Sequence, residues 1–154
     1  MTNAIHIRRA TPDDARLLFE WRNDPETRRA SRTTEPLVWE THVRWLADSL
    51  KNSHRILGIA EMEGTPIGTM RADERKDGYT EISYTVAPTF RGKGFGTSMV
   101  VQFVKEYLSG KELAATIKKG HAPSESLARA LGLSPHHETP SGDPEDLRPN
   151  VEWR

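Results

Sequence analysis

The chain contains no cysteine, which excludes disulfide bonds, thiolate metal sites and a cysteine nucleophile. It also has no excess of charge of either sign, because 22 acidic residues balance 22 lysines and arginines. Net charge therefore gives no reason to expect a nucleic acid or an anionic membrane as a partner. No apolar run approaches transmembrane length, and the N-terminal segment MTNAIHIRRA lacks the apolar core of a signal peptide. We expect a cytoplasmic protein.

Internal repeats and low-complexity tracts are also absent from the sequence, and 154 residues suffice for one domain with a proper core. We therefore expect residues 1–154 to form a single domain. The histidines show no ligand spacing beside a carboxylate, so we predict no metal site. We interpret as surface or packing residues His6, His42, His54, His121, His136 and His137.

Apolar periodicity and turn residues predict an α+β chain in the order β-α-α-β-β-β-α-β-α-β. The expected strands cover residues 5–8, 56–62, 67–72, 80–86, 113–117 and 151–154, with residues 136–139 as a further candidate. The expected helices open at residues 11–14, cover residues 39–50, follow a turn at 91–97, and cover residues 123–131. Residues 26–36 are expected to form a loop or a loose short helix. Hairpins join the middle strands, and a helical crossover makes residues 113–117 parallel to residues 80–86. We therefore predict a mixed, mostly antiparallel sheet flanked by helices.

The rest of the chain is organised around the strand at residues 80–86 and the helix that follows it. The strand alternates, so its residues divide between two faces. Ile82, Tyr84 and Val86 share one face, and Glu81, Ser83 and Thr85 share the other. Pro88 ends the strand because proline lacks the N–H that a ladder requires. The helix carries an apolar stripe up to Leu108, and Gly110 is placed to end it.

Between this strand and helix lies the turn Arg91-Gly92-Lys93-Gly94-Phe95-Gly96-Thr97. Its glycines allow a sharp turn and a close approach of a ligand to the main chain. The N–H groups of the first helical turn lack internal partners, and the helix dipole favours an anion there. The turn therefore predicts a phosphate site. It matches neither a P-loop, because Gly94 follows Lys93, nor the dinucleotide fingerprint, because its third glycine is missing.

The pattern Arg-x-x-Gly-x-Gly at Arg91, Gly94 and Gly96 resembles the acyl-CoA-binding signature of the GCN5-related N-acetyltransferase (GNAT) family. Residues 7–14 resemble the usual opening of that family, and residues 130–133 resemble its closing element. The order of elements agrees over nearly the whole chain. The resemblance implies the acyl-CoA N-acyltransferase fold, with acetyl-CoA as co-substrate and no metal. It implies acetyl transfer by direct attack of a primary amine, with the chain a monomer or homodimer.

The resemblance also implies where coenzyme A would bind. In this family the pantetheine arm lies in a V where the central strand splays from its parallel neighbour. The backbone N–H near Val86 would then act as the oxyanion donor for the thioester. The implied cofactor-binding residues are Thr85, Val86, Arg91, Gly92, Lys93, Gly94, Phe95, Gly96, Thr97 and Ser124.

For the catalytic base the resemblance implies Glu81, which relatives match with a strand glutamate that relays the amine's proton. The alternative is a solvated or salt-bridged strand glutamate. The general acid stays unassigned, because the tyrosine that many relatives carry falls at Ala128. The family's asparagine and serine fall at His121 and Ser124. Tyr84 is a second candidate for the acid, although its alternation places it with the core-facing set.

The acceptor in this fold usually meets the first two helices and the loop between them. Here the stretch Trp-Arg-Asn-Asp-Pro resembles relatives that acetylate amino sugars linked to nucleotides and, less closely, the ribosomal-protein N-terminal acetyltransferases. The implied substrate-binding residues are Trp21, Arg22, Asn23 and Arg28. Arginines suit a diphosphate and tryptophans suit a base. A non-catalytic acyl-CoA-binding sensor module is the alternative from another class.

Overall fold

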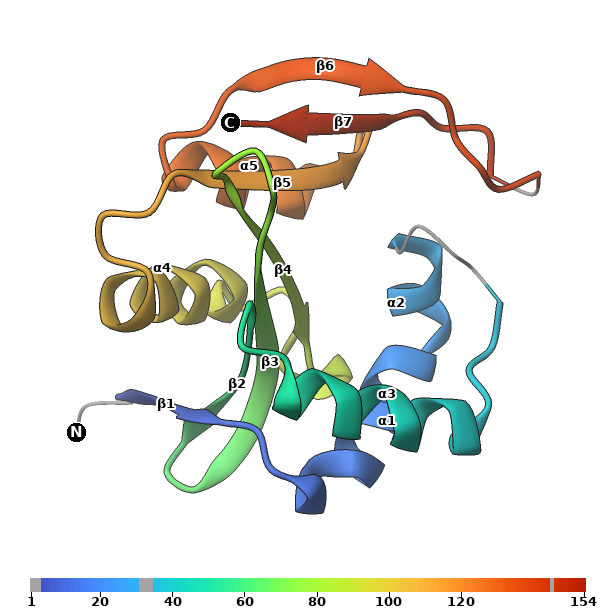
Figure 1. The fold of residues 1–154 in the computed structure, drawn as a ribbon. Coiled ribbons are helices and arrows are strands. Elements are labelled where there is room, and N and C mark those ends of the chain that lie inside the picture. Colours follow the sequence, from blue (N-terminus) through green and yellow to red (C-terminus); the bar gives the residue numbers. More distant parts are fainter. Residues whose placement is uncertain (1–3, 31–34, 145) are drawn as a thin grey trace.

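The computed structural model describes residues 4–30, 35–144 and 146–154, and in these residues seven strands form one sheet in the order β1-β2-β3-β4-β5-β7-β6. Helix α4 covers one face of the sheet, and α1 and α3 lie on the other (Figure 1). The strands are β1 (Ile5–Arg9), β2 (Arg55–Met62), β3 (Thr65–Glu74), β4 (Thr80–Val86), β5 (Leu113–Lys118), β6 (Pro135–Thr139) and β7 (Asn150–Trp153). The α-helices are α1 (Ala15–Asn23), α2 (Pro25–Ala30), α3 (Trp39–Lys51), α4 (Phe95–Tyr107) and α5 (Ala122–Ala130).

The predicted hairpin pairing of β2, β3 and β4 and the parallel pairing of β4 with β5 are confirmed, and β1 pairs antiparallel with β2. The candidate strand at 136–139 is β6, and β7 inserts between β5 and β6. Part of the polar segment at 26–36 forms α2, whose first turn is capped by Asp24. Its carboxylate Oδ2 accepts hydrogen bonds from the backbone N–H groups of Glu26 and Thr27 at 3.1 and 3.2 Å.

The pairing between β4 and β5 covers two positions, Thr80 with Leu113 and Glu81 with Ala114. Beyond these positions the two strands diverge, as the V implied by the family resemblance requires. The strand β4 thus belongs to a run of hairpins on one side, and on the other side it opens towards β5 and α5 (Figure 1).

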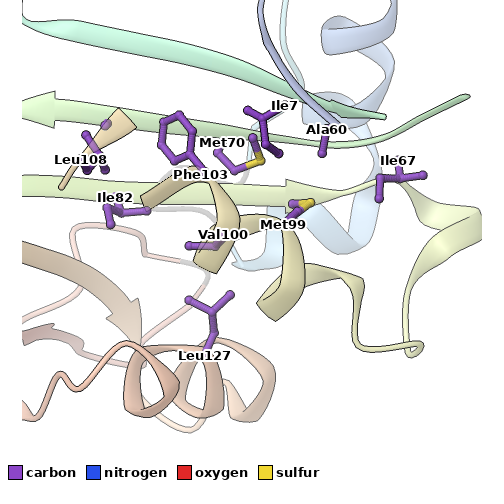
Figure 2. Close-up of a cluster of buried hydrophobic side chains, with 11 residues drawn as sticks. Ile7, Ala60, Ile67, Met70, Ile82, Met99, Val100, Phe103, Leu108 and Leu127 are labelled. Carbon is purple, nitrogen blue, oxygen red and sulfur yellow. The ribbon is translucent and has the colours of Figure 1, made fainter. Parts of the chain in front are cut away.

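The main apolar core lies between the sheet and α4, where Phe103, Met70 and Val100 are fully buried (Figure 2). Burying each such side chain contributes about 1.5–3 kcal/mol. Helix α4 approaches β3 closely at Gly68, where an added Cβ would lie 2.6 Å from Met99 Sδ. The pairing register of β2 and β3 shifts beside this glycine, where Ile67 is the extra residue in β3. Close packing here fixes α4, and with it the turn at its N-terminus.

A second core packs α1 and α3 on the other face of the sheet. It includes Leu18 and Trp21 of α1, Leu46 of α3, and Leu57 and Ile59 of β2. The two cores confirm the predicted division of β4. Its residues Ile82, Tyr84 and Val86 belong to the α4 core, and Glu81, Ser83 and Thr85 lie on the opposite face.

Candidate active site

A cavity of about 530 Å³ opens where β4 and β5 diverge. One wall is formed by β3 and β4, which contribute Arg71 and Glu81. The opposite wall is formed by β5 and α5, which contribute Lys118 and Ser124. Helices α1 and α2 close a third side, with Arg22 among the lining residues. The cavity therefore joins the predicted cofactor edge of β4 to the predicted acceptor helices.

The exposed edge of β4 offers a backbone donor at Val86. Ala87 N–H donates to Ile67 O of β3 at 2.8 Å. Successive N–H groups of a strand point to opposite edges, so the N–H of Val86 points away from β3, towards the side where β5 has diverged. Thr85 lines the cavity beside it. This orientation is the one that an oxyanion donor for a thioester in the V requires.

The predicted phosphate turn has the backbone that its glycines allow. Gly92 and Gly94 have φ values of 73° and 81°, in the left-handed region that favours glycine. Gly94 immediately precedes α4, so the N–H groups of the first turn point outward from its end. Lys93 is exposed beside them, and Thr97 is half-buried. Neutral N–H donors, a helix dipole and one cation together suit a pyrophosphate.

Gly96 has a packing role instead. A Cβ at this position would lie 3.2 Å from the side chains of both Tyr84 and Val86. Its absence lets the first turn of α4 lie directly on β4. Phe95 packs edge-on against Phe90, with ring centroids 5.9 Å apart, and steadies the same turn.

Arg91 departs from the predicted phosphate contact. Its guanidinium lies 2.7 Å from Asp24 Oδ2, 2.5 Å from Glu26 Oε2 and 2.7 Å from Thr27 Oγ1. Burial acts to raise the pKa of the Asp24 carboxyl, but the hydrogen bonds from Arg91 and from the backbone of Thr27 and Glu26, with the charge of Arg91, together lower it. The side chain of Arg91 thus ties the phosphate turn to the start of α2.

On the acceptor side, Arg22 is held by two aromatic side chains. Its Nη1 lies 3.0 Å from His42 Nδ1, and its guanidinium carbon lies 3.8 Å from the centre of the Trp45 ring. Because arginine can only donate, Nδ1 of His42 accepts, and Nε2–H donates to Ala15 O at 2.8 Å. Burial lowers the pKa of His42 and keeps the ring neutral. Burial, with Arg71 and Arg55 nearby, lowers the pKa of Arg22 to about 10.

The cations around Arg22 outnumber their counterions. Arg55 Nε lies 2.5 Å from Asp73 Oδ1, and Arg71 Nε lies 2.9 Å from Oδ2 of the same carboxylate. The second contact is an ion pair without hydrogen-bond geometry, because Nε of Arg71 is buried and makes no hydrogen bond. No carboxylate among the described residues pairs with Arg22. Two arginines share one aspartate, and the third is held by neutral groups.

Glu81 lines the cavity and is ion-paired. Arg75 Nη1 lies 3.5 Å from its Oε1, and the same guanidinium contacts Glu152 and Asp77 at 2.5 Å each. Both interpretations of Glu81 from the sequence thus have support. It faces the cavity as a base must, and it also takes part in a salt bridge.

A chain of hydroxyl and imidazole groups spans the cavity between β4 and α5. Tyr84 Oη lies 3.2 Å from Ser124 Oγ, which lies 2.7 Å from His121 Nδ1. Burial raises the pKa of Tyr84, and burial lowers the pKa of His121. Ala128, at the family's tyrosine position, is fully buried. The alternation of β4 was predicted correctly, but the core-facing interpretation of Tyr84 is incomplete, because its hydroxyl reaches the cavity wall.

Lys118 closes the cavity between β5 and α2. It is 4% exposed, and its Nζ donates at 2.7 Å to both Arg29 O and Asp146 Oδ2. The two ionic partners of Asp146 hold the pKa of its carboxyl well below the usual range, with the hydrogen bond from Arg148 ahead of that from Lys118. Sequence reasoning missed this lysine, although a lysine that ends an apolar strand is a signal that could have been used.

The predicted substrate-binding residues separate in the structure. Arg22 and Arg28 line the cavity. Trp21 does not, because it lies on the apolar stripe of α1 and is buried in the second core. Asn23 joins α1 to the segment before α3, with Oδ1 accepting from Leu37 N–H at 2.9 Å. The cavity tryptophan is Trp45 of α3, which sequence reasoning did not single out.

The family is decided by comparison of the sequence with family models. The model of the acetyltransferase (GNAT) domain matches residues 5–134. The chain belongs to the GNAT family. It is therefore an acetyl-CoA-dependent N-acetyltransferase, and the open edge of β4 and the glycine turn before α4 fit this co-substrate. A search of curated proteins finds no match.

Solved structures agree with this fold. The GNAT chain is similar to a ribosomal-protein-alanine N-acetyltransferase from Brucella melitensis, with 24% identity, a TM-score of 0.82, and coverage of 96% of this chain and 97% of that one. It is also similar to yncA, a putative acetyltransferase from Salmonella typhimurium with acetyl-CoA, with 20% identity, a TM-score of 0.79, and coverage of 98% and 92%. The structural similarity at these identities establishes the fold alone and does not identify the acceptor.

Two further results concern residues 4–30, 35–144 and 146–154. No helix in this part of the GNAT chain is long and apolar enough to cross a bilayer. No group of three or more histidines and acidic residues there could hold a metal ion.

Proposed function

We propose that this enzyme acetylates the primary amine of an anionic small molecule, and that the acceptor is an amino sugar linked to a nucleotide. The observation that carries the proposal is Arg22. Its guanidinium is oriented by His42 and stacks on Trp45. It lines the cavity and has no carboxylate partner among the described residues. A guanidinium held in this way is ready to pair with a phosphate or carboxylate of the acceptor.

The charge of the cavity supports the same conclusion. Among the described residues that line it, the arginines and lysine are Arg22, Arg28, Arg71 and Lys118, and the acidic residues are Glu35 and Glu81. Asp73, outside the lining, neutralises one further charge. Asp146, also outside the lining, pairs with Lys118. Arg22 has no carboxylate partner among the described residues, so the phosphates of a nucleotide-linked acceptor would supply the counterion that Arg22 lacks. Trp45 offers its ring beside them, although Arg22 already covers one of its faces.

In the proposed reaction the acceptor nitrogen attacks the thioester carbon of acetyl-CoA. The N–H of Val86 stabilises the charge that develops on the thioester oxygen, and the turn at residues 91–97 holds the pyrophosphate. Glu81 receives the proton that leaves the nitrogen, and Arg75 keeps its carboxylate in place. The new C–N bond forms as the C–S bond breaks, so the products are an acetamide and coenzyme A.

A protein N-terminal acetyltransferase is the second candidate. It is favoured by the likeness to the enzyme from Brucella melitensis, which is described as acting on a ribosomal protein. The non-catalytic acyl-CoA sensor considered from the sequence is set aside, because the chain is a GNAT acetyltransferase. The presence of Glu81, Tyr84 and Arg22 in the cavity favours an enzyme over a sensor.

The test is thiol release from acetyl-CoA with three acceptors: an amino sugar linked to UDP, the same amino sugar without the nucleotide, and a peptide that begins with Arg or Ser. We expect the UDP-linked sugar to have the largest kcat/KM. Arg22→Gln should raise its KM about 10- to 100-fold, because hydrogen bonds to charged groups contribute roughly 1.5–3 kcal/mol.

Arg16→Gln is the matched control. Arg16 lies on the same helix and stacks on Trp39, at 4.8 Å from the ring centre, but it is exposed and outside the cavity lining. Its variant should keep the wild-type KM. Equal effects of the two substitutions, or preference for the sugar without its nucleotide, would contradict the anionic acceptor. Preference for the peptide would favour the second candidate, and turnover with none of the three acceptors would contradict both.

A further inference from the structure

The acetyl transfer reaction releases a thiolate, and the family's usual tyrosine for protonating it is replaced by Ala128. The structure offers a different tyrosine. Tyr84 lies on β4, three residues beyond the last pair with β5, and so within the opening between the strands. Its hydroxyl crosses to α5 on the opposite wall, where it contacts Ser124 Oγ at 3.2 Å. Tyr84 is thus a proton donor at the edge where the thioester is expected to lie.

The ring of Tyr84 is fixed from behind. It packs against Gly96 in the first turn of α4, where even one methyl group would come within 3.2 Å of the ring. The phosphate turn and the phenol therefore share one support. Coenzyme A held by that turn is positioned relative to Tyr84 through the same residues.

Ser124 and His121 extend the chain along the cavity wall, which both residues line. Ser124 Oγ lies 2.7 Å from His121 Nδ1. No described residue forms a hydrogen bond with Nε2 of His121, and the ring is half-buried at the start of α5. The charged groups that act on this ring come from several elements: Arg148, Lys118 of β5, Glu26 of α2 and Glu125 of α5.

We propose that Tyr84 is the general acid that protonates the departing thiolate of coenzyme A, and that Ser124 and His121 return a proton to it. The proposal rests on acetyl transfer from acetyl-CoA and is independent of which amine is the acceptor. Tyr84 is the catalytic residue of this set, because it meets the reacting sulfur. Ser124 and His121 act through it.

The protons balance along this chain. As the C–S bond breaks, Tyr84 O–H transfers its proton to sulfur and forms the S–H bond of coenzyme A. Ser124 O–H transfers a proton to the tyrosine oxygen, and His121 Nδ1–H transfers one to Ser124. Nε2 of His121 takes a proton from solvent, so the ring begins and ends neutral, with its tautomer exchanged. The proton that leaves the amine passes to Glu81 and then to solvent, so the overall reaction consumes none.

The environments of the two end groups suit these roles. Burial raises the pKa of Tyr84, so the phenol is protonated at neutral pH and holds a proton to give. Burial and the cations Arg148 and Lys118 lower the pKa of His121, so the imidazole is neutral and can change tautomer. The 3.2 Å contact of Tyr84 with Ser124 is long for two hydroxyls, as catalytic hydrogen bonds often are before the substrates bind.

The kinetic test uses Tyr84→Phe, which removes the hydroxyl and keeps the ring on Gly96. With acetyl-CoA and the acceptor that gives turnover, we expect kcat to fall about a hundredfold, the range of general acid catalysis, with KM changed less than threefold. Ser124→Ala should lower kcat by a smaller factor, and the double variant should be no slower than Tyr84→Phe alone, because the groups act as a unit. Tyr107→Phe, in α4 and away from this cavity, is the matched control.

Multiplied effects in the double variant, or wild-type kcat in a folded Tyr84→Phe enzyme, would overturn the proposal. Folding of each variant is checked by its thermal unfolding midpoint.

A second measurement needs no acceptor. Two-bond ¹H–¹⁵N spectra of the wild-type enzyme at neutral pH should show His121 as the Nδ1–H tautomer, and Ser124→Ala should reduce the share of that tautomer. An Nε2–H tautomer in the wild type would overturn the proton chain. If no amine of the panel is acetylated, the proposed acceptor class fails, and this experiment still decides the arrangement of His121 and Ser124.

Discussion

The two faces of β4 differ in their chemistry although they alternate along seven residues. The face towards α1 and α3 carries Glu81 and lies among guanidinium groups, with Arg71 on the neighbouring strand and Arg22 reaching over from α1. The face towards α4 and α5 carries Tyr84 among apolar residues, with neutral hydroxyl and imidazole partners. The pleat of one strand therefore separates a charged side, suited to an ionic acceptor, from a neutral side suited to a thiol.

The largest effect is expected at the charged face. Glu81→Gln removes the proposed base and should lower kcat about a thousandfold, within the range of general base catalysis, with an unchanged dissociation constant for acetyl-CoA. Glu74→Gln is the control, because Glu74 ends β3 outside this cavity and pairs with His54 and Lys111. Stopped-flow turnover and calorimetry separate the two parameters. A loss of less than threefold would leave Glu81 as a structural salt bridge.

A double variant at Glu81 and Tyr84 compares the two faces of β4 directly. If Glu81 and Tyr84 act on different proton transfers, then the losses of Glu81→Gln and Tyr84→Phe should multiply in the double variant. Within one face, the losses at Tyr84 and Ser124 should not multiply. If the losses multiply in both double variants, or in neither, then the two faces of β4 do not serve separate proton transfers.

A smaller effect is expected at Arg91, which motif reasoning assigned to the pyrophosphate and which the structure binds to Asp24 and Glu26. Arg91→Gln should raise the acceptor KM about tenfold, as loss of one charge-assisted contact does, and change the acetyl-CoA dissociation constant less than threefold. Lys93→Gln changes an exposed residue of the same turn. It should weaken the binding of acetyl-CoA and leave the acceptor KM nearly unchanged. If Arg91→Gln weakens the binding of acetyl-CoA more than the binding of the acceptor, then Arg91 contacts the pyrophosphate, as the motif predicts.

The smallest changes in the acceptor KM are expected from two variants of His42, each of which replaces one of its ring nitrogens. His42→Asn keeps an acceptor near the Nδ1 position for Arg22, and His42→Gln keeps a donor near the Nε2 position for Ala15 O. We expect the Asn variant to hold the acceptor KM within threefold and the Gln variant to raise it about fivefold, as for one weakened hydrogen bond. Equal KM values would show that His42 does not orient Arg22.

His42 also gives a pH dependence of stability with a defined sign. Burial lowers its pKa in the folded protein, whereas the unfolded chain titrates near about 6.5. As the pH falls below that value, the unfolded state binds a proton that the folded state does not, so the free energy of unfolding decreases. Urea unfolding at pH 7.5 and 5.5 should show a smaller decrease for His42→Asn than for the wild type. His121 adds a pH dependence of the same sign to the free energy of unfolding. Because both proteins contain His121, its contribution cancels when they are compared.

The fold was largely predictable because its signals are local. Apolar periodicity and turn residues predicted β2 to β5, and Gly110 and Pro88 marked where elements end. The parallel crossover followed from the helix between β4 and β5. Helix α2 was less predictable because its six residues carry no apolar stripe, and it is held instead by Asp24 and Arg91.

The site was less predictable because its contacts are distant in sequence. The motif correctly predicted the backbone of the turn at Gly92 and Gly94, since a left-handed φ depends on the residue itself. It did not predict the partner of Arg91, which lies 67 residues away. Trp21 is predicted from the motif to bind substrate, but helix periodicity places it in the core, and Trp45 lines the cavity instead. Such exchanges are set by tertiary packing, which one sequence does not reveal.

The short junction between β4 and β5 also bears on how the chain folds. Strands β2, β3 and β4 are joined by neighbouring hairpins, whereas β7 must return past β6 to reach β5 (Figure 1). Local contacts form faster than distant ones, so the hairpin half of the sheet is expected to assemble first and the β5-β7-β6 half to dock onto it later. The cavity comes into existence at that docking step. Binding of acetyl-CoA would therefore report on the last stage of folding, and the co-substrate would stabilise the joint between two halves that share two pairs of residues.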